Sequence, residues 1–271
     1  MRLAPFAGPD AAPEDAARTD VALLLHGFGA DRLSWLANAP ALAGAAHVLA
    51  PDLPGHGATA ASGDGGFETV LGTAREALAG VLRERESGGL ATRLHLVGHS
   101  LGGAVAIALA ADETLPVATL VAIAPAGLGT GIDVDWLRAL VALEDETEAL
   151  AHLGRLVADP RMVSRQAAGA LLAHLGRDGA RAALDALARD LDGLEARLAP
   201  AVDAVAARSV ARACVWGERD AVNPPDEDRI AALGGESVRF ERAGHLPHVE
   251  RAGRFNRLAL GLIEAAASDA G

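Results

Sequence analysis

The sequence predicts an α/β fold, in which a mostly parallel sheet is flanked by helices. Short apolar runs of strand length alternate with longer helical patterns, and this alternation is typical of parallel strands joined by right-handed crossovers. Glycine-rich and polar segments follow four of the runs, as expected at the carboxyl ends of parallel strands. The 271 residues, 51% of them hydrophobic, can form one large domain or two small ones with a sizeable core.

The first half of the chain contains most of the predicted strands. Residues 1–8 are a candidate edge strand, and the uninterrupted apolar run at residues 21–25 is typical of a strand that is buried on both faces. The elements expected after it are a helix at 31–44 with Asp31 as its N-cap, a strand at 47–50, a helix at 67–86, a strand at 93–97, a helix at 101–111 and a strand at 117–124.

The strand pattern stops after residue 127. Residues 128–208 show helical patterns only, divided by glycines and prolines. We therefore expect an all-helical cap of residues 128–208, inserted after the sixth strand of a core domain that comprises residues 1–127 and 209–271. In that core domain the pattern resumes with a strand at 210–216, a helix after Pro225, a strand at 237–241 and a final helix at 247–267.

A serine between glycines lies where the predicted strand at 93–97 meets the next helix. Residues 98–103 read Gly-His-Ser-Leu-Gly-Gly, and a serine between a strand and a helix in this pattern is typical of a nucleophile elbow. A serine held in a tight, strained turn leaves no room for neighbouring Cβ atoms, which gives the glycines a steric reason. Ser100 is therefore a candidate nucleophile, although so short a motif is weak evidence by itself.

Later strand ends supply an acid and a histidine. Asp220 and His245 each follow a predicted strand, and serine, acid, histidine is the chain order of one class of catalytic triad. A serine hydroxyl is a poor nucleophile unless a base takes its proton, and a carboxylate that fixes the tautomer of that base improves it. We expect Ser100 to be the nucleophile, His245 the general base and then acid, and Asp220 the orienting carboxylate.

The acid and the base have competitors in the sequence. His248 competes with His245, but it begins the predicted final helix, whereas a catalytic imidazole needs a loop such as the one at Gly244. Asp220 is preferred because it lies one short turn past its strand. The competing carboxylates are Glu218, Asp226 and Asp228.

Other residues near the strand ends are expected to complete the site. The backbone N–H groups of Phe28 and Leu101 are predicted to form the oxyanion hole, and His26 to hold the Phe28 loop in shape. The candidates for lining the substrate pocket are His99, Trp35 and Trp136.

Composition narrows the ligand classes. A net charge of −12 argues against nucleic acid or an anionic membrane as a partner and favours a small neutral or apolar molecule. The histidines lack metal-ligand spacing and the glycines lack phosphate-binding spacing, so no metal and no cofactor are expected. Residues 1–20 do not resemble a secretory signal, and no run approaches the ~18 apolar residues of a membrane span. We expect a cytoplasmic protein; its oligomeric state stays open.

Five segments in this order resemble the α/β-hydrolase superfamily, and they cover nearly the whole chain. They are His26-Gly27-Phe28-Gly29, Asp52-Leu53-Pro54-Gly55-His56-Gly57, Gly98-His99-Ser100-Leu101-Gly102-Gly103, Trp216-Gly217-Glu218-Arg219-Asp220 and Gly244-His245. The resemblance implies an α/β-hydrolase fold. Dehalogenases of that fold use an aspartate nucleophile, so Ser100 argues against one of these.

A finer resemblance rests partly on the predicted cap. Residues 31–35, 124–129 and 159–166 are similar to the hydrolase-like domain of the dihydrolipoyl acetyltransferase component of acetoin dehydrogenase. Such proteins carry a lipoyl domain with a modified lysine, and this sequence contains no lysine. We therefore expect either a free-standing relative without a lipoyl domain or common ancestry without that activity.

The sequence thus predicts a carboxylesterase-like serine hydrolase that acts on an ester, thioester or related carbonyl compound through an acyl-enzyme. Three alternatives stay open: an acyltransferase to a thiol such as dihydrolipoamide or coenzyme A, a carbon–carbon bond hydrolase, and a non-catalytic binding module of the same fold. The cap is expected to close over the site and exclude water.

Overall fold

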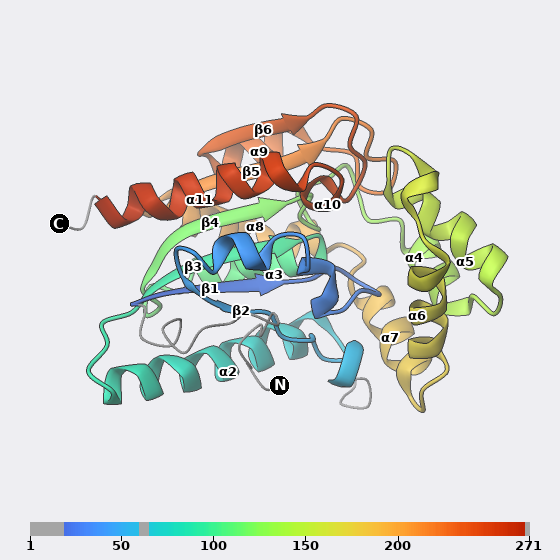
Figure 1. Cartoon of the computed structure of the whole chain (residues 1–271), viewed down its shortest axis with the longest axis horizontal. Coiled ribbons are helices and arrows are strands. Elements are labelled where there is room, and N and C mark those ends of the chain that lie inside the picture. Colours follow the sequence, from blue (N-terminus) through green and yellow to red (C-terminus); the bar gives the residue numbers. More distant parts are fainter. Residues whose placement is uncertain (1–18, 60–64, 269–271) are drawn as a thin grey trace.

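The computed structural model describes residues 19–59 and 65–268 and contains a six-stranded parallel sheet (Figure 1). The strands are β1 (Asp20–Leu25), β2 (His47–Leu49), β3 (Arg93–His99), β4 (Val117–Ile123), β5 (Ala211–Gly217) and β6 (Glu236–Phe240). They lie in the order β2-β1-β3-β4-β5-β6, and every neighbouring pair is parallel. All carboxyl ends therefore meet at one edge, and the predicted α/β class is confirmed.

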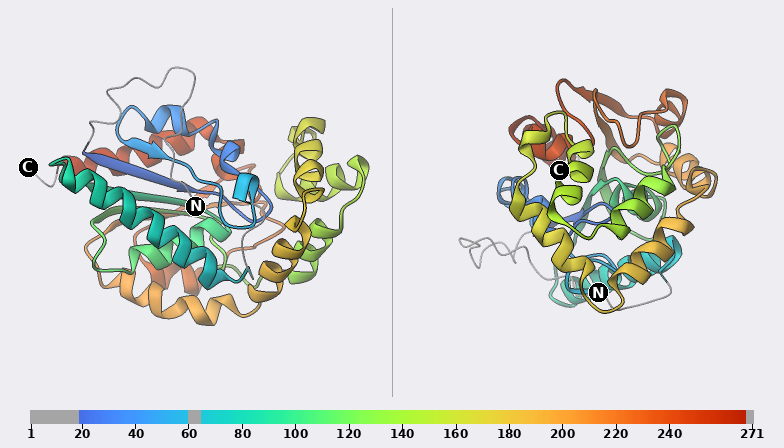
Figure 2. Two further views of the ribbon diagram at one scale, coloured as in Figure 1. Left: turned by 90° about the horizontal axis from the view of Figure 1, so that it is seen from below. Right: turned by 90° about the vertical axis from the view of Figure 1, so that its right-hand side faces the viewer.

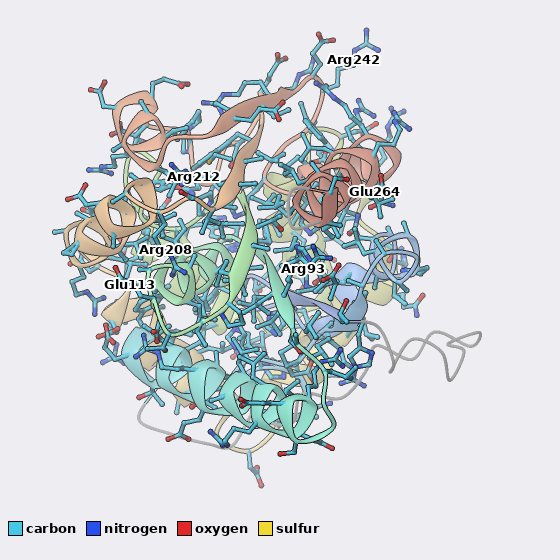
Figure 3. The ribbon with its side chains drawn as sticks, turned by 90° about the vertical axis from the view of Figure 1, so that its left-hand side faces the viewer. Arg93, Glu113, Arg208, Arg212, Arg242 and Glu264 are labelled. Atoms are coloured by element: carbon cyan, nitrogen blue, oxygen red, sulfur yellow. The ribbon has the colours of Figure 1, made fainter. Side chains whose placement is uncertain are left out.

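Helices cover both faces of the sheet, as the view along it shows (Figure 3). Leu23 and Leu25 of β1 contribute to one apolar core, whereas Ala22 and Leu24 contribute to the other, because successive side chains of a strand point to opposite faces. The first core is completed by α2 (Phe67–Ser87), α3 (Leu101–Ala110), α8 (Leu194–Ala206) and α9 (Glu227–Leu233), and the second by α1 (Ala39–Leu42) and α11 (Ala252–Ser268).

Four further helices lie beyond the carboxyl edge of the sheet (Figure 2, left). They are α4 (Val134–Ala142), α5 (Glu146–Leu153), α6 (Arg165–Leu175) and α7 (Ala180–Asp190). The next helix, α8, instead returns to the sheet and packs against α3. Parallel strands need a crossover, and α8 provides it between β4 and β5. The segment predicted as a cap, residues 128–208, thus contains one helix of the sheet layer.

The predicted position of this helical segment, after the sixth strand, is wrong for the described residues. Four strands precede it and two follow. The candidate edge strand at residues 1–8 lies outside the described part of the chain.

Two predicted helices are each divided in the structure. The one expected at residues 31–44 is a 3₁₀ helix at Arg32–Trp35 followed by α1, because Pro40 opens a new helix instead of continuing the first. Asp31 caps the 3₁₀ helix as predicted, accepting from the Leu33 N–H at 2.8 Å. The final helix consists of α10 (Pro247–Glu250) and α11, and the break at Arg251 has non-helical backbone angles.

No helix in residues 19–59 and 65–268 combines the length and the apolar character that crossing a membrane requires.

Candidate active site

Ser100 occupies a strained turn between β3 and α3. Its backbone has φ 52° and ψ −114°, a conformation that L-residues rarely adopt. A Cβ atom on Gly98 would lie 2.1 Å from the Gly102 carbonyl oxygen, and one on Gly102 would lie 2.2 Å from the Leu25 carbonyl oxygen. The backbones approach so closely that only glycine fits at either position, which is the steric reason expected from the sequence.

Asp220 and His245 are hydrogen-bonded to each other. The His245 Nδ1–H donates to Asp220 Oδ2 at 2.8 Å, and the backbone N–H groups of Val222 and Asn223 donate to Asp220 Oδ1 at 2.9 Å each. Burial alone would raise the pKa of Asp220, but the neighbouring His245 and these hydrogen bonds outweigh it, so the pKa lies below its usual value. Asp220 is therefore an ionised, fixed acceptor for the imidazole.

Among the residues that the structure describes, neither the competing acids nor the competing base is bonded to Asp220 or His245. Asp226 caps α9 by accepting from the backbone N–H groups of Asp228 and Arg229. Within the described residues, no hydrogen bond or ion pair joins Glu218, Asp226 or Asp228 to His245. His248 is fully buried, and burial lowers its pKa to about 3. It packs against Trp35, with ring centroids 4.8 Å apart, and does not reach the acid.

Ser100 and His245 line the same cavity at the carboxyl edge of the sheet. The cavity is small, about 30 Å³, whereas one water molecule needs roughly 10–15 Å³ in the same measure. Its wall is mostly apolar and combines core loops with the helical segment. The lining residues are Phe28, Ser100, Leu101, Ala126, Ile132, Asp133, Trp136, Leu137, Leu191, Val222, Asn223 and His245.

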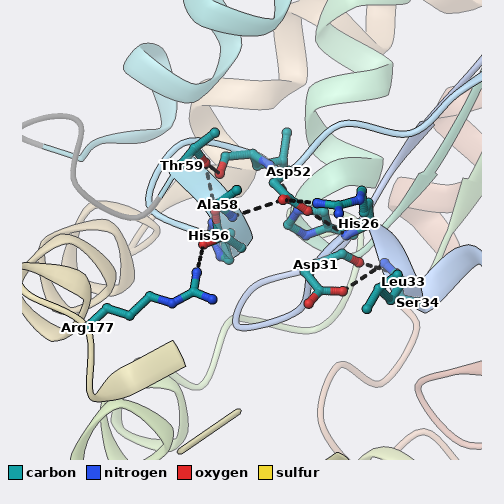
Figure 4. Close-up of polar contacts among 12 residues, drawn as sticks. His26, Asp31, Leu33, Ser34, Asp52, His56, Ala58, Thr59 and Arg177 are labelled. Carbon is teal, nitrogen blue, oxygen red and sulfur yellow. Dashed lines mark hydrogen bonds and ion pairs between the residues drawn. The ribbon is translucent and has the colours of Figure 1, made fainter. Parts of the chain in front are cut away.

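Phe28 and Leu101 both line this cavity, and their backbone N–H groups have no acceptor among the described residues. The loop that carries Phe28 is held by His26 (Figure 4). The His26 Nδ1–H donates to the Gly27 carbonyl at 2.8 Å, while Nε2 accepts from the Leu53 N–H at 2.9 Å. Burial lowers the pKa of His26, so it stays neutral and can serve as donor and acceptor at once.

Asp52 fixes the second loop of this network (Figure 4). It accepts from the backbone N–H groups of Arg32 and Ala58 at 2.9 Å and from Arg32 Nη1 at 2.7 Å. The loop after β1 and the loop after β2 are thereby joined into one support for the predicted oxyanion hole.

Comparison with known proteins decides the family. Residues 22–258 match the alpha/beta hydrolase family. The chain belongs to this family.

Two known proteins are similar to this alpha/beta hydrolase over most of its length. It is 33% identical over 240 residues, 88% of its length, to the dihydrolipoyllysine-residue acetyltransferase component of the acetoin cleaving system of Cupriavidus necator. It is 34% identical over 242 residues, 89% of its length, to the component with the same name from Pseudomonas putida. The chain spans 62% of the length of each of these relatives.

A solved hydrolase shows the same fold. The 2-hydroxy-6-oxo-6-phenylhexa-2,4-dienoate hydrolase from Rhodococcus sp. strain RHA1 matches with a TM-score of 0.77 and 20% identity, over 91% of both chains. The predicted α/β-hydrolase fold is confirmed, and so is the resemblance to the acetoin-system component.

Two of the three predicted pocket-lining residues of this hydrolase lie away from the cavity, and only Trp136 lines it. Trp35 is fully buried in the core beneath α11, because the 3₁₀ turn directs it toward the sheet. His99 lies behind the base, where its Nε2–H donates to the His245 carbonyl at 2.9 Å. Burial holds the pKa of His99 well below its usual value, so His99 supports the His245 backbone as a neutral ring.

The sequence prediction missed Asn223, which is buried and lines the cavity. Its Nδ2 donates to the carbonyls of Ala124 and Pro125 at 3.0 and 3.1 Å, so it ties the loop of Asp220 to the end of β4. Asn223 follows Asp220 by three residues, and its backbone N–H donates to the Asp220 side chain. This spacing is typical of an Asx-type turn and would have indicated Asn223 in the sequence.

The described residues contain no group of three or more His, Cys, Asp or Glu side chains that could hold a metal ion. The thiol of Cys214 is buried in β5, and burial raises its pKa to about 12. A thiol with so high a pKa is a poor nucleophile.

Proposed function

We propose that this alpha/beta hydrolase is a serine hydrolase that cleaves an ester or thioester with a short, apolar acyl group. One observation carries the proposal: His245, held by Asp220 at 2.8 Å, lines the same cavity as the strained Ser100. A buried acid, an oriented imidazole and a serine at a strand end are the parts that acyl transfer needs.

The proposed reaction has two halves. Ser100 Oγ attacks the carbonyl carbon while His245 takes its proton, and Asp220 stabilises the imidazolium that forms. The backbone N–H groups of Phe28 and Leu101 donate to the developing oxyanion. His245 then protonates the leaving alcohol or thiol, and a water activated by His245 hydrolyses the acyl-enzyme and frees Ser100.

The cavity favours a short acyl group. Its volume of about 30 Å³ leaves room for few heavy atoms, and apolar side chains such as Trp136 and Leu137 would surround them. Both residues belong to α4, so the helical segment shapes the acyl site and, as we propose, excludes water from it as a cap.

A fluorophosphonate probe tests the nucleophile. We expect it to label Ser100, and Ser100→Ala to abolish both the label and the turnover of p-nitrophenyl acetate; in a serine protease the comparable loss is roughly 10⁶-fold. Ser87→Ala, which removes an exposed hydroxyl that donates only to the Arg83 carbonyl, is the matched control and should keep both. Labelling that survives Ser100→Ala, or an unlabelled protein without turnover of any short acyl ester, would overturn the proposal.

Acyl transfer to a thiol is the second candidate, because the relatives at 33% and 34% identity are named as acetyltransferase components. In this case the thiol takes the place of water in the second half-reaction. We expect dihydrolipoamide to raise the rate at which the alcohol is released from an acetyl ester. We also expect S-acetyldihydrolipoamide to form as the second product. Equal release with and without the thiol, and no thioester product, would leave hydrolysis alone.

A further inference from the structure

A second cavity lies behind the loop that carries His245. It measures about 240 Å³, and its walls include Arg219, Arg242 and Arg251. The three arginines come from different segments: one follows β5, one follows β6 and one follows α10. No residue lines both this cavity and the one at Ser100, so the two are separate.

Arginines outnumber acids in the wall of this cavity by three to two. Within the part of the chain that the structure describes, none of the three guanidinium groups pairs with a carboxylate. Arg251 donates only to backbone carbonyls, those of Glu241, Glu250 and Arg242. Three arginines without a carboxylate partner in the wall of one cavity stand out in a protein with a net charge of −12.

The two carboxylates in the cavity wall are already engaged. Glu250 accepts from the backbone N–H groups of Gly244 and Ala158 at 2.7 Å each, and it is only 8% exposed. Asp159 is paired with Arg161 through a two-pronged contact of 2.9 and 2.7 Å. The charge of Asp159 is thus balanced by Arg161, and the single charge of Glu250 does not balance the three arginines.

The backbone at Arg242 is also unusual. Its φ is +55°, a region that favours glycine and costs energy in other residues. The turn that carries Arg242 forms part of the cavity wall.

We propose that this cavity binds the phosphate or pyrophosphate group of a phosphate-bearing ligand. Guanidinium groups match phosphate oxygens with paired N–H donors, and three of them suit a multiply charged anion. Arg219 directly precedes Asp220, and Glu250 links the loop of His245 to the Ala158 loop of the helical segment. An anion bound here therefore bridges the acid loop, the base loop and the helical segment.

Calorimetric titration with inorganic pyrophosphate tests the site without relying on activity. We expect saturable binding, weakened roughly 10-fold or more by either Arg219→Gln or Arg242→Gln, because each removes a charged hydrogen-bond donor. Both side chains are exposed, so circular dichroism should show unchanged folding. Arg257→Gln, which removes an exposed arginine of α11 that lines neither cavity, is the control and should bind as the parent does.

Two outcomes would overturn the proposal. One is that neither pyrophosphate nor sulfate shows saturable binding to the parent protein. The other is binding that both Arg219→Gln and Arg242→Gln leave unchanged.

A kinetic arm distinguishes the two possible sources of the phosphate. If it belongs to the substrate, Arg242→Gln should raise KM for acetyl-coenzyme A but not for a neutral acetyl thioester. If it belongs to a separate effector, pyrophosphate should change turnover of the neutral thioester in the parent but not in Arg242→Gln. Because the titration needs no turnover, failure of the proposed hydrolase activity would leave the anion site testable.

Discussion

Single backbone contacts decide whether Ser100 can occupy its turn. Gly98 lies in β3 and Gly102 in α3, and the two elements cross at a separation that excludes any Cβ atom. The geometry that exposes the serine therefore depends on residues that have no side chain and take no part in the chemistry.

Gly98→Ala should destabilise the protein and abolish turnover. The new methyl group would lie 2.1 Å from the Gly102 carbonyl oxygen, and overpacking of this severity should lower the free energy of unfolding by about 3 kcal/mol or more. Gly72→Ala in α2 is the control: its methyl group would meet nothing within 4 Å, and the better helix former should raise stability by about 1 kcal/mol. Urea denaturation measures the free energy of unfolding of both variants. Equal stabilities of the two variants would contradict this account of the elbow.

Asp220→Asn should retain the fold and lose turnover. The amide can no longer fix the His245 tautomer through the 2.8 Å contact; the same change in a chymotrypsin-like protease lowers kcat by about 10⁴. The comparison is Asp226→Asn, which keeps a good N-cap on α9 and should keep kcat. A value of kcat for Asp220→Asn close to that of Asp226→Asn would remove Asp220 from the mechanism.

The catalytic candidates could be predicted at this scale because strand ends and chain order are visible in a sequence. Ser100, Asp220 and His245 each follow an apolar run, and parallel strands bring such ends together. The environments of Trp35 and His99 could not be predicted, since they depend on the rotation of a short 3₁₀ turn and on the packing of α10 against β3.

At the scale of elements, α4 connects the helical segment to the candidate site. Trp136 and Leu137 line the cavity, whereas Val141 on the same helix is buried away from it. In the proposed reaction, one face of this helix would set the length of the acyl group.

Leu137→Ala should shift the preference of the enzyme toward longer acyl chains. Each methylene that enters the enlarged cavity gains about 0.8 kcal/mol, so kcat/KM for butyrate relative to acetate esters should rise roughly 4-fold per methylene. Val141→Ala removes buried methyl groups outside the cavity and should lower stability without changing this ratio. An unchanged ratio in Leu137→Ala would mean that the acyl group binds elsewhere.

Most elements could be predicted from periodicity, but their interruptions could not. Within the predicted helix at residues 31–44, Pro40 is visible in the sequence, yet whether it bends or opens a helix depends on packing. At the break, the Arg251 side chain donates to the Glu241 and Arg242 carbonyls, and periodicity cannot show such contacts. The return of α8 to the sheet is likewise a tertiary event.

At the scale of the whole molecule, buried histidines link stability to pH. Seven of the nine histidines have a pKa below 6.5, with burial as the first cause in each case. They are His26, His56, His95, His99, His152, His174 and His248. The pKa values of His56 and His248 fall to about 3.

Acidification below pH 6.5 should therefore destabilise the fold. In that range the unfolded chain takes up protons on these histidines and the folded chain does not, so stability falls as the pH drops toward the folded-state pKa of about 3. For each of His56 and His248, the loss between pH 7 and pH 5 should be about 2 kcal/mol.

His248→Leu checks this linkage by urea denaturation at the two pH values. The leucine cannot take up a proton, so the loss between pH 7 and pH 5 should be smaller by about 2 kcal/mol in the variant than in the parent. If the two proteins lose the same amount, His248 does not bind its proton as the burial predicts.

The strand order has a consequence for how the protein acquires activity. β6 lies at the edge of the sheet, next to β5, and the base of the proposed mechanism follows this last strand, whereas the nucleophile follows β3 near the centre. During refolding from urea, Ser100 can reach its turn before His245 has a partner. The rate at which ester turnover recovers would then report when the final strand docks. A nucleophile-directed label added during refolding would distinguish a formed elbow from a complete site.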